Sequence, residues 1–234
     1  MKCLNRKPLL ELSNICFSYE SGRKIINNLD FSLLEKEKVG IIGSTGCGKS
    51  TLLYLMMGLL TVSKGEISIF GKLMKGEKDF ASVRTQIGFL FQNSDDQLFS
   101  PTVIDDIAFG PLNQGKTYDE AKNIAHELLE KLDIVGLKHR ITHRLSGGEK
   151  KLVALATALA MEPKFLLLDE PLTGLDPYAK RKIIKLIGDL SLPMIIISHD
   201  WDFLEQVACS VYTIDDGRLS SFSVKNLSPS LSGF

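Results

Sequence analysis

The spacing of apolar residues divides this chain of 234 residues into regions of different structure. Apolar and polar positions alternate within the first 40 residues, for example over residues 10–15 and 29–33. A period of two is typical of strands with one buried face, so this part is predicted to form antiparallel strands. Between residues 101 and 161 the spacing becomes helical, and Thr117 with Glu120 forms a capping-box pattern ahead of one helix.

Short apolar runs outside the helical block predict further strands. Leu166, Leu167 and Leu168 form a run that is too short for a typical helix, so we interpret it, with Phe165, as a buried strand. The strands expected on these grounds cover residues 39–42, 66–70, 87–91, 165–168 and 194–197. Strands and helices that follow one another in this way indicate an α/β fold.

The sequence GSTGCGKST follows one of these strands and precedes a helical run at residues 52–60. It matches the pattern G-x-x-x-x-G-K-[ST] in the strand, loop and helix context that a phosphate-binding loop requires. Backbone N–H groups of such a loop curl around phosphate oxygens, and the helix dipole turns its positive end to the same anion. A plain glycine turn is the alternative, and it leaves the Lys-Ser pair unexplained. The residues expected to bind nucleotide here are Gly43, Ser44, Thr45, Gly46, Cys47, Gly48, Lys49, Ser50 and Thr51.

Two carboxylates follow the buried strand at residues 165–168. We expect Lys49 to reach the β and γ phosphates and the Ser50 hydroxyl to ligate Mg²⁺. Asp169 is expected to hold the same Mg²⁺ through water, and Glu170 to polarise the attacking water as general base. Charged residues at the end of a buried strand are often simply solvated at the edge of the sheet. Because these two occur together with a phosphate loop, we favour the catalytic interpretation.

The sequence LSGGE at residues 145–149 predicts a second anion site. Ser146, Gly147 and Gly148 present a hydroxyl and unobstructed backbone N–H groups at the start of a helix. One chain needs one such site per triphosphate, so this one is expected to serve a nucleotide held by another protomer. Ser146 and Glu149 also match the S-x-x-E capping box, and a well-capped helix start can still bind phosphate.

These motifs, in this order, resemble those of the nucleotide-binding subunit of ATP-binding cassette (ABC) transporters. The resemblance runs from Leu9 to about Leu219. It implies an α/β P-loop NTPase fold, with a RecA-like core sheet and helices, an antiparallel β subdomain and an inserted α-helical signature subdomain. It also implies that residues 43–51 are the Walker A loop, 145–149 the signature and 166–170 the Walker B strand.

The resemblance assigns roles to residues outside these three motifs. It implies that Tyr19 stacks on adenine, that Gln92 links Mg²⁺ and water to the membrane partner, and that His199 is the switch histidine at the γ-phosphate. It places Asp176 in the D-loop, which crosses between protomers. Apart from the resemblance, Tyr19 could simply fill a strand face, and Asp176 followed by Pro177 is a helix start.

A narrower likeness is carried by the sequence FQNSDDQLFSPTVIDDIAFGPLN at residues 91–113. This segment resembles the cobalt-type or energy-coupling-factor ATPases, which power the uptake of transition metals or vitamins. The likeness implies an importer subunit that hydrolyses ATP and moves a membrane partner as two cassettes close around Mg-ATP and reopen. Cobalt, nickel and vitamins all stay open as cargo, because a cassette subunit does not touch the cargo.

The signature departs from the pattern that is usual in the family. Glu149 stands where Gln is usual, and Leu152 stands where an Arg is usual. A carboxylate beside a γ-phosphate adds repulsion unless it folds back onto the helix start, as the capping box allows. Our hypothesis is that Glu149 tunes the affinity of the dimer and is not catalytic.

The chain is long enough for one large domain with an inserted subdomain. We expect residues 1–92 and 162–219 to form the core and the β subdomain, residues 93–161 the helical subdomain, and residues 220–234 a tail. Longer relatives of the coupling-factor type carry an extra C-terminal dimerisation segment, for which this chain leaves little room.

Composition restricts the choice of partners and compartment. With 28 basic and 28 acidic residues, the formal net charge is zero, which gives no support for binding to nucleic acid or anionic lipid. The four cysteines form no C-x-x-C pair, which fits reduced thiols in the cytosol. The longest apolar stretch is about half as long as a bilayer crossing requires, and we recognise no signal peptide. We therefore expect a peripheral protein on the cytoplasmic face of the membrane.

The expected partners are a second ABC ATPase, identical or different, and an integral membrane subunit, with no nucleic acid and no direct contact with cargo. A soluble ABC ATPase that acts on nucleic acid or ribosomes is the alternative. The chromosome types insert long coiled coils between the first two motifs and the translation types usually fuse two cassettes, whereas about 100 residues separate these motifs here. A P-loop kinase is the third hypothesis, and it leaves the signature and His199 unexplained.

Overall fold

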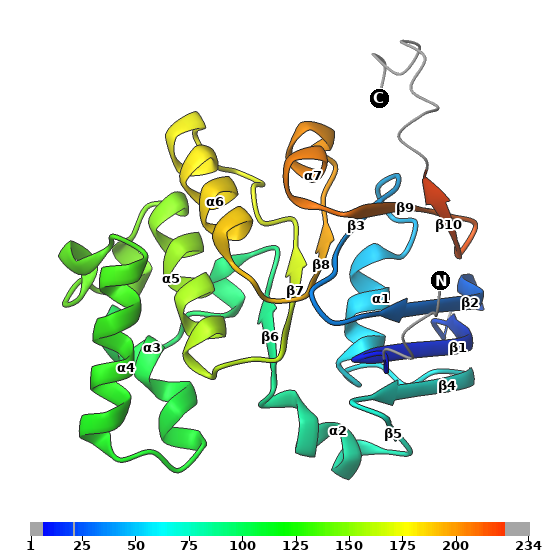
Figure 1. The fold of residues 1–234 in the computed structure, drawn as a ribbon, viewed down its shortest axis with the longest axis horizontal. Helices are drawn as coiled ribbons and strands as arrows, with labels where there is room; N and C mark the ends of the chain where they lie inside the picture. The colour runs from blue at the N-terminus through cyan, green and yellow to red at the C-terminus, as the bar shows by residue number, and fades with distance from the viewer. Residues whose placement is uncertain (1–6, 21, 223–234) are drawn as a thin grey trace, which may run out of the picture.

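A computed structural model describes residues 7–20 and 22–222, which form two sheets and a block of helices (Figure 1). The strands of the larger sheet are β3 (Lys38–Ile42), β6 (Ile87–Leu90), β7 (Phe165–Asp169), β8 (Met194–Ile197), β9 (Ser210–Asp215) and β10 (Arg218–Phe222). Their order across the sheet is β10-β9-β3-β8-β7-β6. The neighbouring strands from β9 to β6 run parallel, and β10 is antiparallel at the edge.

The central strands are apolar on both faces because both faces are covered. In β7, Phe165 and Leu167 belong to one hydrophobic cluster, whereas Leu166 and Leu168 belong to the other. The four residues of β8 divide between the two clusters in the same alternating way. A continuous apolar run is therefore what a parallel strand buried on two sides requires, as the sequence predicted.

The smaller sheet is antiparallel and confirms the alternating pattern near the N-terminus. Its strands are β1 (Leu10–Ser18), β2 (Lys24–Leu33), β4 (Lys64–Ile69) and β5 (Lys72–Leu73), in the order β2-β1-β4-β5. One hydrophobic cluster joins the inner face of this sheet to helix α1 (Lys49–Met56) and to one face of the larger sheet. The β subdomain is thus packed directly onto the element that follows the phosphate loop.

The remaining helices of the described residues are α2 (Glu77–Arg84), α3 (Val103–Asn113), α4 (Tyr118–Lys131), α5 (Gly147–Ala160), α6 (Pro177–Asp189) and α7 (Trp201–Val207). Helices α3 and α4, with the turns that follow them, form a helical block that shares the hydrophobic cluster on the other face of the larger sheet (Figure 1). Short 3-10 turns occur at η1 (Ser94–Asp96), η2 (Val135–Leu137) and η3 (Thr142–Arg144). The predicted capping box of α4 is confirmed, because Thr117 and Glu120 each bond to the backbone of the other. None of the helices within residues 7–20 and 22–222 is both long enough and apolar enough to cross a membrane.

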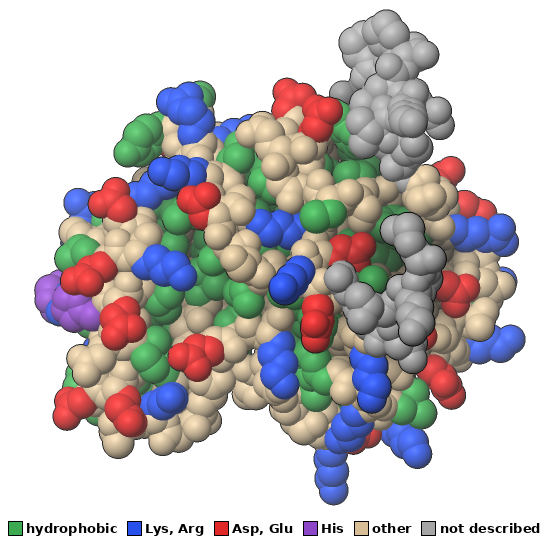
Figure 2. Space-filling model, viewed as in Figure 1, with side chains coloured by type: hydrophobic (Ala, Val, Ile, Leu, Met, Phe, Trp, Pro, Cys, Tyr) green, Lys and Arg blue, Asp and Glu red, His purple; other side chains and the backbone are tan. Residues whose placement is uncertain are grey.

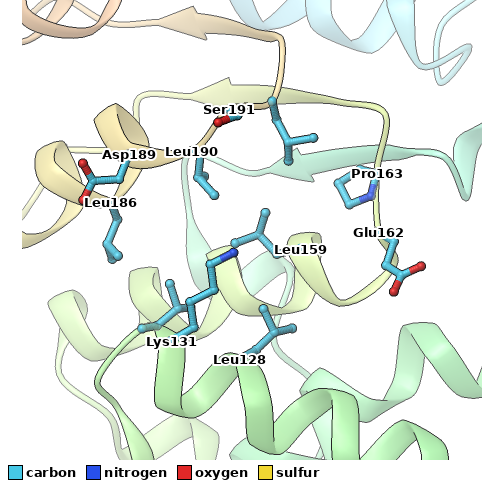
Figure 3. Close-up of a pocket in the computed structure, with 11 residues that line it drawn as sticks. Leu128, Lys131, Leu159, Glu162, Pro163, Leu186, Asp189, Leu190 and Ser191 are labelled. Carbon is cyan, nitrogen blue, oxygen red and sulfur yellow. The ribbon is translucent and has the colours of Figure 1, made fainter. Parts of the chain in front are cut away.

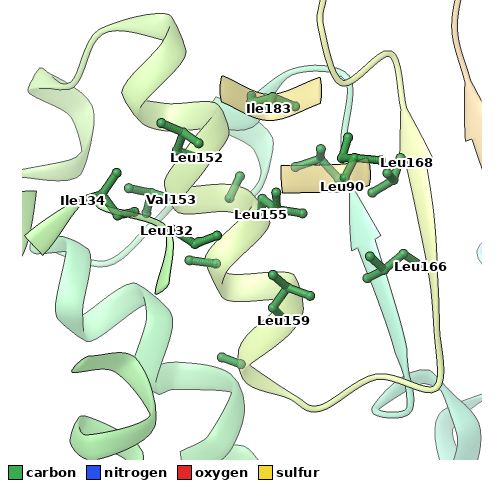
Figure 4. Packing of buried hydrophobic residues seen from close by; sticks show 14 of the residues in the cluster. Leu90, Leu132, Ile134, Leu152, Val153, Leu155, Leu159, Leu166, Leu168 and Ile183 are labelled. Atoms are coloured by element: carbon green, nitrogen blue, oxygen red, sulfur yellow. The ribbon is translucent and has the colours of Figure 1, made fainter. Parts of the chain in front are cut away.

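Helix α5 connects the helical block to the sheet. Figure 4 shows Leu152, Val153, Leu155 and Leu159 of α5 among residues from the helical block and from β6 and β7. The cluster is continuous from α3 and α4 through α5 to the sheet, so the helical block does not have a core of its own. Any movement of this block against the sheet must therefore involve α5.

Two boundaries differ by three residues or more from those that the sequence predicted, whereas the ends of the predicted strands in the apolar runs differ by at most two. The apolar run after the phosphate loop continues to Leu60, but α1 ends at Met56 because Gly58 adopts a left-handed φ of 65°, which is typical after a helix. Strand β10 extends three residues into the predicted tail, since Phe222 pairs with Val211 of β9. The serine-rich sequence has no alternating apolar pattern from which a strand could be predicted. The strand forms nevertheless, because its hydrogen bonds to β9 come from the backbone. The rest of the predicted tail, residues 223–234, lies outside the described residues.

Leu155 provides a test of the shared core. Its side chain is fully buried in the cluster that joins α5 to the sheet. Leu155→Ala is expected to lower the free energy of unfolding by about 2–5 kcal/mol, through lost burial and the cavity left behind. Denaturant unfolding measures this, with Leu59→Ala as the control, because Leu59 is exposed and its loss should change stability by about 0.5 kcal/mol or less. Equal effects at the two positions would contradict the described core.

Candidate active site

The ends of the parallel strands bring the predicted site residues together. Strand β3 leads into Gly43, β6 into Gln92 and β7 into Glu170. Strand β8, which lies between β3 and β7, leads through Ser198 to His199. Because the carboxyl ends of parallel strands meet at one edge of a sheet, motifs that are far apart in the sequence converge there (Figure 1).

The phosphate loop has the backbone conformation that its glycines allow. Gly46 and Gly48 adopt φ of 79° and 104°, in the left-handed region where side chains are strained. A Cβ on Gly48 would also lie 2.7 Å from Cγ2 of Ile25 in β2. Helix α1 then begins with no side-chain cap and no acidic residue in its first turn. Its first N–H groups are thus left for an anion.

Two side chains contact the phosphate loop, that of Lys49 from within it and that of Tyr19 from outside it. The Lys49 amine donates hydrogen bonds to the carbonyl oxygens of Gly43, at 2.7 Å, and Ser44, at 2.9 Å, so it is curled over the loop backbone. The Tyr19 hydroxyl lies 3.1 Å from the Thr51 hydroxyl, and the side chain is 44% exposed. Tyr19 therefore does not fill a buried strand face, and its ring stands beside the loop where a flat base could stack on it.

Asp169 has the properties of a cation ligand. It is buried, and its Oδ1 atom has no hydrogen-bond partner among the described residues. Burial raises the pKa of this carboxyl above its ordinary value, while a hydrogen bond from Ser50 and the charge of Lys49 act in the opposite direction. An unpaired buried carboxylate oxygen beside Ser50 fits a hard divalent cation such as Mg²⁺.

The predicted Mg²⁺ site depends on the nucleotide as well as on the protein. Within the described ranges, no group of three or more His, Cys, Asp and Glu side chains could hold a metal ion without other ligands. Mg²⁺ in phosphate loops takes one or two protein ligands and completes its shell with phosphate oxygens and water. Ser50 and Asp169 supply protein ligands of this kind.

Glu170 is oriented by two neighbours. Its Oε2 atom lies 2.8 Å from Nδ1 of His199 and accepts a hydrogen bond from the Thr173 hydroxyl at 3.3 Å. The Glu170 backbone has φ of 46°, which is uncommon for a residue other than glycine. Glu170, Thr173 and His199 line a small cavity of about 130 Å³. A buried carboxylate held by two partners at the end of β7 is suited to act as general base.

A larger cavity, of about 600 Å³, lies away from these residues (Figure 3). It is enclosed by α4, the end of α5 and the end of α6, and none of the predicted site residues lines it. Most of its wall is aliphatic, and its residues are Leu128, Lys131, Leu132, Leu159, Glu162, Pro163, Leu186, Asp189, Leu190, Ser191 and Leu192. Cavity size alone therefore does not locate a site for a triphosphate in this protein.

The predicted capping box at the start of α5 is confirmed. The Ser146 hydroxyl accepts from the Glu149 N–H at 3.3 Å, and Glu149 Oε2 accepts from the Ser146 N–H at 2.8 Å. Ser146 and Gly147 are exposed. Among the described residues, no hydrogen bond or ion pair joins residues 145–149 to the phosphate loop at residues 43–51. The structure therefore does not bring the two anion sites of one chain together.

The start of α6 packs against the start of α5. A Cβ on Gly148 would lie 2.8 Å from the Cβ of Ala179, so glycine is needed for this close approach. Asp176 caps α6 as predicted, because its Oδ1 accepts from the N–H groups of Tyr178 at 2.8 Å and Ala179 at 3.0 Å. The loop at residues 174–177 and the start of α5 thus lie side by side, and both reach the surface.

Comparison with known proteins decides the family. Residues 26–173 match the family described as ABC transporter. The chain belongs to this family. It is 41% identical over 215 residues to the energy-coupling factor transporter ATP-binding protein EcfA of Methanothermobacter thermautotrophicus, covering 90% of this chain and 69% of that protein.

Solved structures agree with this assignment. The cassette superimposes on cbiO1 of Clostridium perfringens, part of the ABC transporter complex cbiONQ, with a TM-score of 0.82 and 35% identity over 91% of this chain and 87% of that one. It also resembles a bacterial ABC transporter cassette solved as a dimer, with a TM-score of 0.82 and 25% identity over 90% and 96% of the two chains. The expected fold class, the ATPase activity of the family and the likeness to cobalt-type and energy-coupling-factor cassettes are confirmed.

Sequence reasoning missed two residues that fasten to α5 the loop that begins at Phe91 and Gln92, which the resemblance to the family makes the Q-loop. The amine of Lys151 is buried and donates to the carbonyl oxygens of Gln92, at 2.7 Å, and Phe91, at 3.2 Å. The Gln97 side chain accepts from the Phe91 N–H at 3.2 Å and donates to the Ala154 carbonyl at 2.8 Å. The available signal was helical spacing, because Lys151 lies four residues before a buried leucine and shares its face.

Lys151 makes the stability of the cassette depend on pH. Desolvation lowers its pKa from 10.5 to about 8, against the opposing charges of Asp169 and Glu170. Between these two values the unfolded chain binds more protons, so stability should rise with pH across this window. Lys151→Met removes the titration, and the difference in unfolding free energy, wild type minus variant, should increase by on the order of 1–3 kcal/mol from pH 8 to 10.5.

Denaturant unfolding at several pH values measures this difference. The variant Lys64→Met is the matched control, because Lys64 lies on the surface of the β subdomain. A difference between wild type and Lys151→Met that stays flat from pH 8 to 10.5 would contradict the assigned effect of burial.

Proposed function

We propose that this chain is the ATP-binding and ATP-hydrolysing subunit of an energy-coupling-factor or cobalt-type importer, and that two copies close head to tail around two nucleotides. One observation carries the proposal: each chain has a phosphate loop with its catalytic acids at one sheet edge, and a separate exposed anion site at the start of α5. The resemblance to EcfA and to cbiO1, part of a transporter complex, supports the importer class.

Hydrolysis uses groups that converge at the sheet edge. Lys49 binds the β and γ phosphates, and Glu170 accepts the proton of the attacking water. His199 contacts the γ-phosphate and, at 2.8 Å from Glu170, holds that carboxylate in place. Ser50, Asp169 and Gln92 are the residues that would hold Mg²⁺, directly or through water, and the cation would supply positive charge against the charge that develops on the phosphates. Tyr19 stacks on the adenine.

Dimer closure follows from the two separate anion sites. Ser146, Gly147 and Gly148 of one copy take the γ-phosphate held by the other copy, while Asp176 lies in the loop between the two sites. Because this contact needs the γ-phosphate, ATP favours the closed dimer and its hydrolysis favours the open state. The dimeric relative with the same fold supports this arrangement.

The membrane partner binds an aromatic surface beside the Q-loop. Phe99 and Phe109 are 66% and 43% exposed, and their rings meet edge to face with centroids 4.7 Å apart. Asp106 fixes the loop beneath them by accepting from the N–H groups of Phe99, at 3.3 Å, and Ser100, at 3.1 Å. A rigid exposed aromatic pair is typical of a binding surface. This contact holds the cassette on the cytoplasmic face of the membrane. The cargo that the transporter imports is a transition metal ion, cobalt or nickel, or a vitamin.

Replacing the general base tests hydrolysis and closure together. Glu170→Gln should lower ATP turnover by on the order of 10²–10⁴-fold because the proton acceptor is lost, whereas ATP binding is kept. ATP with Mg²⁺ should then convert the variant to a stable dimer, which sedimentation measures. The double variant Glu170→Gln, Lys49→Ala is the control and should stay monomeric. A Glu170→Gln chain that remains monomeric at saturating ATP would overturn the head-to-tail proposal.

The aromatic surface can be tested separately from catalysis. Phe99→Ser with Phe109→Ser should abolish co-purification with the co-expressed membrane subunits of the transporter, because the rings form the contact. ATP hydrolysis by the isolated chain should stay within about twofold, since neither ring touches the catalytic residues. Val135→Ser is the matched control, because Val135 is an exposed apolar residue elsewhere in the helical block. If the variant retains the membrane subunits, the aromatic surface is not the contact. If the wild-type chain recovers bound nucleic acid in place of membrane subunits, the importer role is overturned.

A further inference from the structure

The carboxylate that departs from the usual signature is paired with an arginine outside the signature. Arg140 Nη1 donates to Glu149 Oε1 at 3.1 Å. The other oxygen, Oε2, accepts from the Ser146 N–H at 2.8 Å. Glu149 is therefore bound at both oxygens, by the serine of the predicted anion site on one side and by Arg140 on the other.

This pair balances two opposing electrostatic effects. A negative charge in the first turn of α5 is favourable because the helix dipole presents its positive end there. The same charge opposes the approach of a phosphate to Ser146. The neighbouring Lys150 does not offset it, since its amine is paired with Asp95 at 2.6 Å. Among the described residues, Arg140 is the cation that forms an ion pair with Glu149.

Arg140 is held by its backbone, so its position does not depend on the ion pair. Its carbonyl oxygen accepts from the Val103 N–H at 3.1 Å. Two residues later, the Thr142 hydroxyl donates to the Ser100 carbonyl at 2.6 Å, and a β-bridge joins Thr102 to Ile141. The segment before the signature is thus fastened to the loop that carries Phe99.

The ion pair between Arg140 and Glu149 lies at the surface of the protein. The Arg140 side chain is 58% exposed and the Glu149 side chain is 29% exposed, so both charged groups reach solvent. Salt should therefore screen their interaction and the repulsion that Glu149 exerts on a phosphate.

We propose that Arg140 is a positioning residue for ATP hydrolysis: it neutralises Glu149 and thereby allows Ser146 and the start of α5 to accept the γ-phosphate held by a second copy. This inference rests on the head-to-tail dimer described under Proposed function. It explains how a signature with a carboxylate in place of an amide can bind an anion.

The inference predicts an effect that depends on residue 149. In the presence of Glu149, Arg140→Gln leaves an unpaired negative charge at the anion site. The ATP concentration for half-maximal dimerisation should then rise about threefold to tenfold at low salt, and less at high salt because the charges are screened. In a chain that carries Glu149→Gln there is no charge at residue 149 to neutralise, so Arg140→Gln should change this ATP concentration little. Arg140→Lys keeps the charge and should restore most of the affinity.

A double-mutant cycle measures this dependence. All four chains carry Glu170→Gln, so that ATP is not hydrolysed. The reference chain carries no other change, and the other three carry Arg140→Gln, Glu149→Gln, or both. Half-maximal dimerisation is determined by sedimentation at two salt concentrations. All four chains should fold, because both side chains reach solvent and a glutamine at residue 149 can keep the capping box. Near-ultraviolet circular dichroism checks the fold.

The outcomes separate this inference from the proposal beneath it. The role of Arg140 is supported if Arg140→Gln weakens ATP-dependent dimerisation only when residue 149 is Glu, if high salt reduces this loss, and if Arg140→Lys restores the affinity. If Arg140→Gln weakens dimerisation equally when residue 149 is Glu and when it is Gln, at both salt concentrations, the role of Arg140 is purely structural and the inference is overturned. The inference is also overturned if Arg140→Gln does not weaken dimerisation at all. In those two cases the reference chain still dimerises and the proposed function stands. If the reference chain stays monomeric with ATP, both fail.

Discussion

Backbone pairing between β3, β8 and β7 fixes where the reacting groups of this cassette can lie. The three strands are parallel and their register is set by burial on both faces, since a shift by one residue would exchange the two hydrophobic clusters. With the register fixed, Lys49, Asp169 and His199 follow strands that end at one edge. The strain at Glu170, with its left-handed backbone, is then tolerated because the preceding strand cannot move.

Helix α5 is the second constraint, because three functions depend on it. Its first turn is the exposed anion site, Lys151 in its second turn binds the Q-loop carbonyl oxygens, and its apolar face completes the core between the helical block and the sheet. Because α5 is rigid, the signature at its start and the Q-loop bound by Lys151 must move together. The loop that carries Phe99 is fastened to the segment before the signature, so in the proposed function a movement of the aromatic surface reaches the signature.

Local features of the fold could be predicted from the sequence, because they depend on neighbouring residues. The period of two gave β1 and β2, the apolar runs gave β7 and β8, and both capping boxes were found where S/T-x-x-E occurs. The site motifs followed from residue types at fixed spacing. The contacts that orient the site could not be predicted, because their partners lie far apart in the chain. Glu170 meets His199 across 29 residues, and Lys151 meets Gln92 across 59.

The same distinction between local and distant contacts applies to Glu149 in the signature. The capping box predicted that its carboxylate folds back to Ser146, and it does, but no local rule predicts a cation from a separate turn. With Arg140 beside it, Glu149 can stabilise the start of α5 without repelling a phosphate. A neutralised site still holds phosphate less tightly than a site with a net positive charge. Weak holding suits a contact that must release after each hydrolysis, because a closed dimer that could not open would stop the cycle.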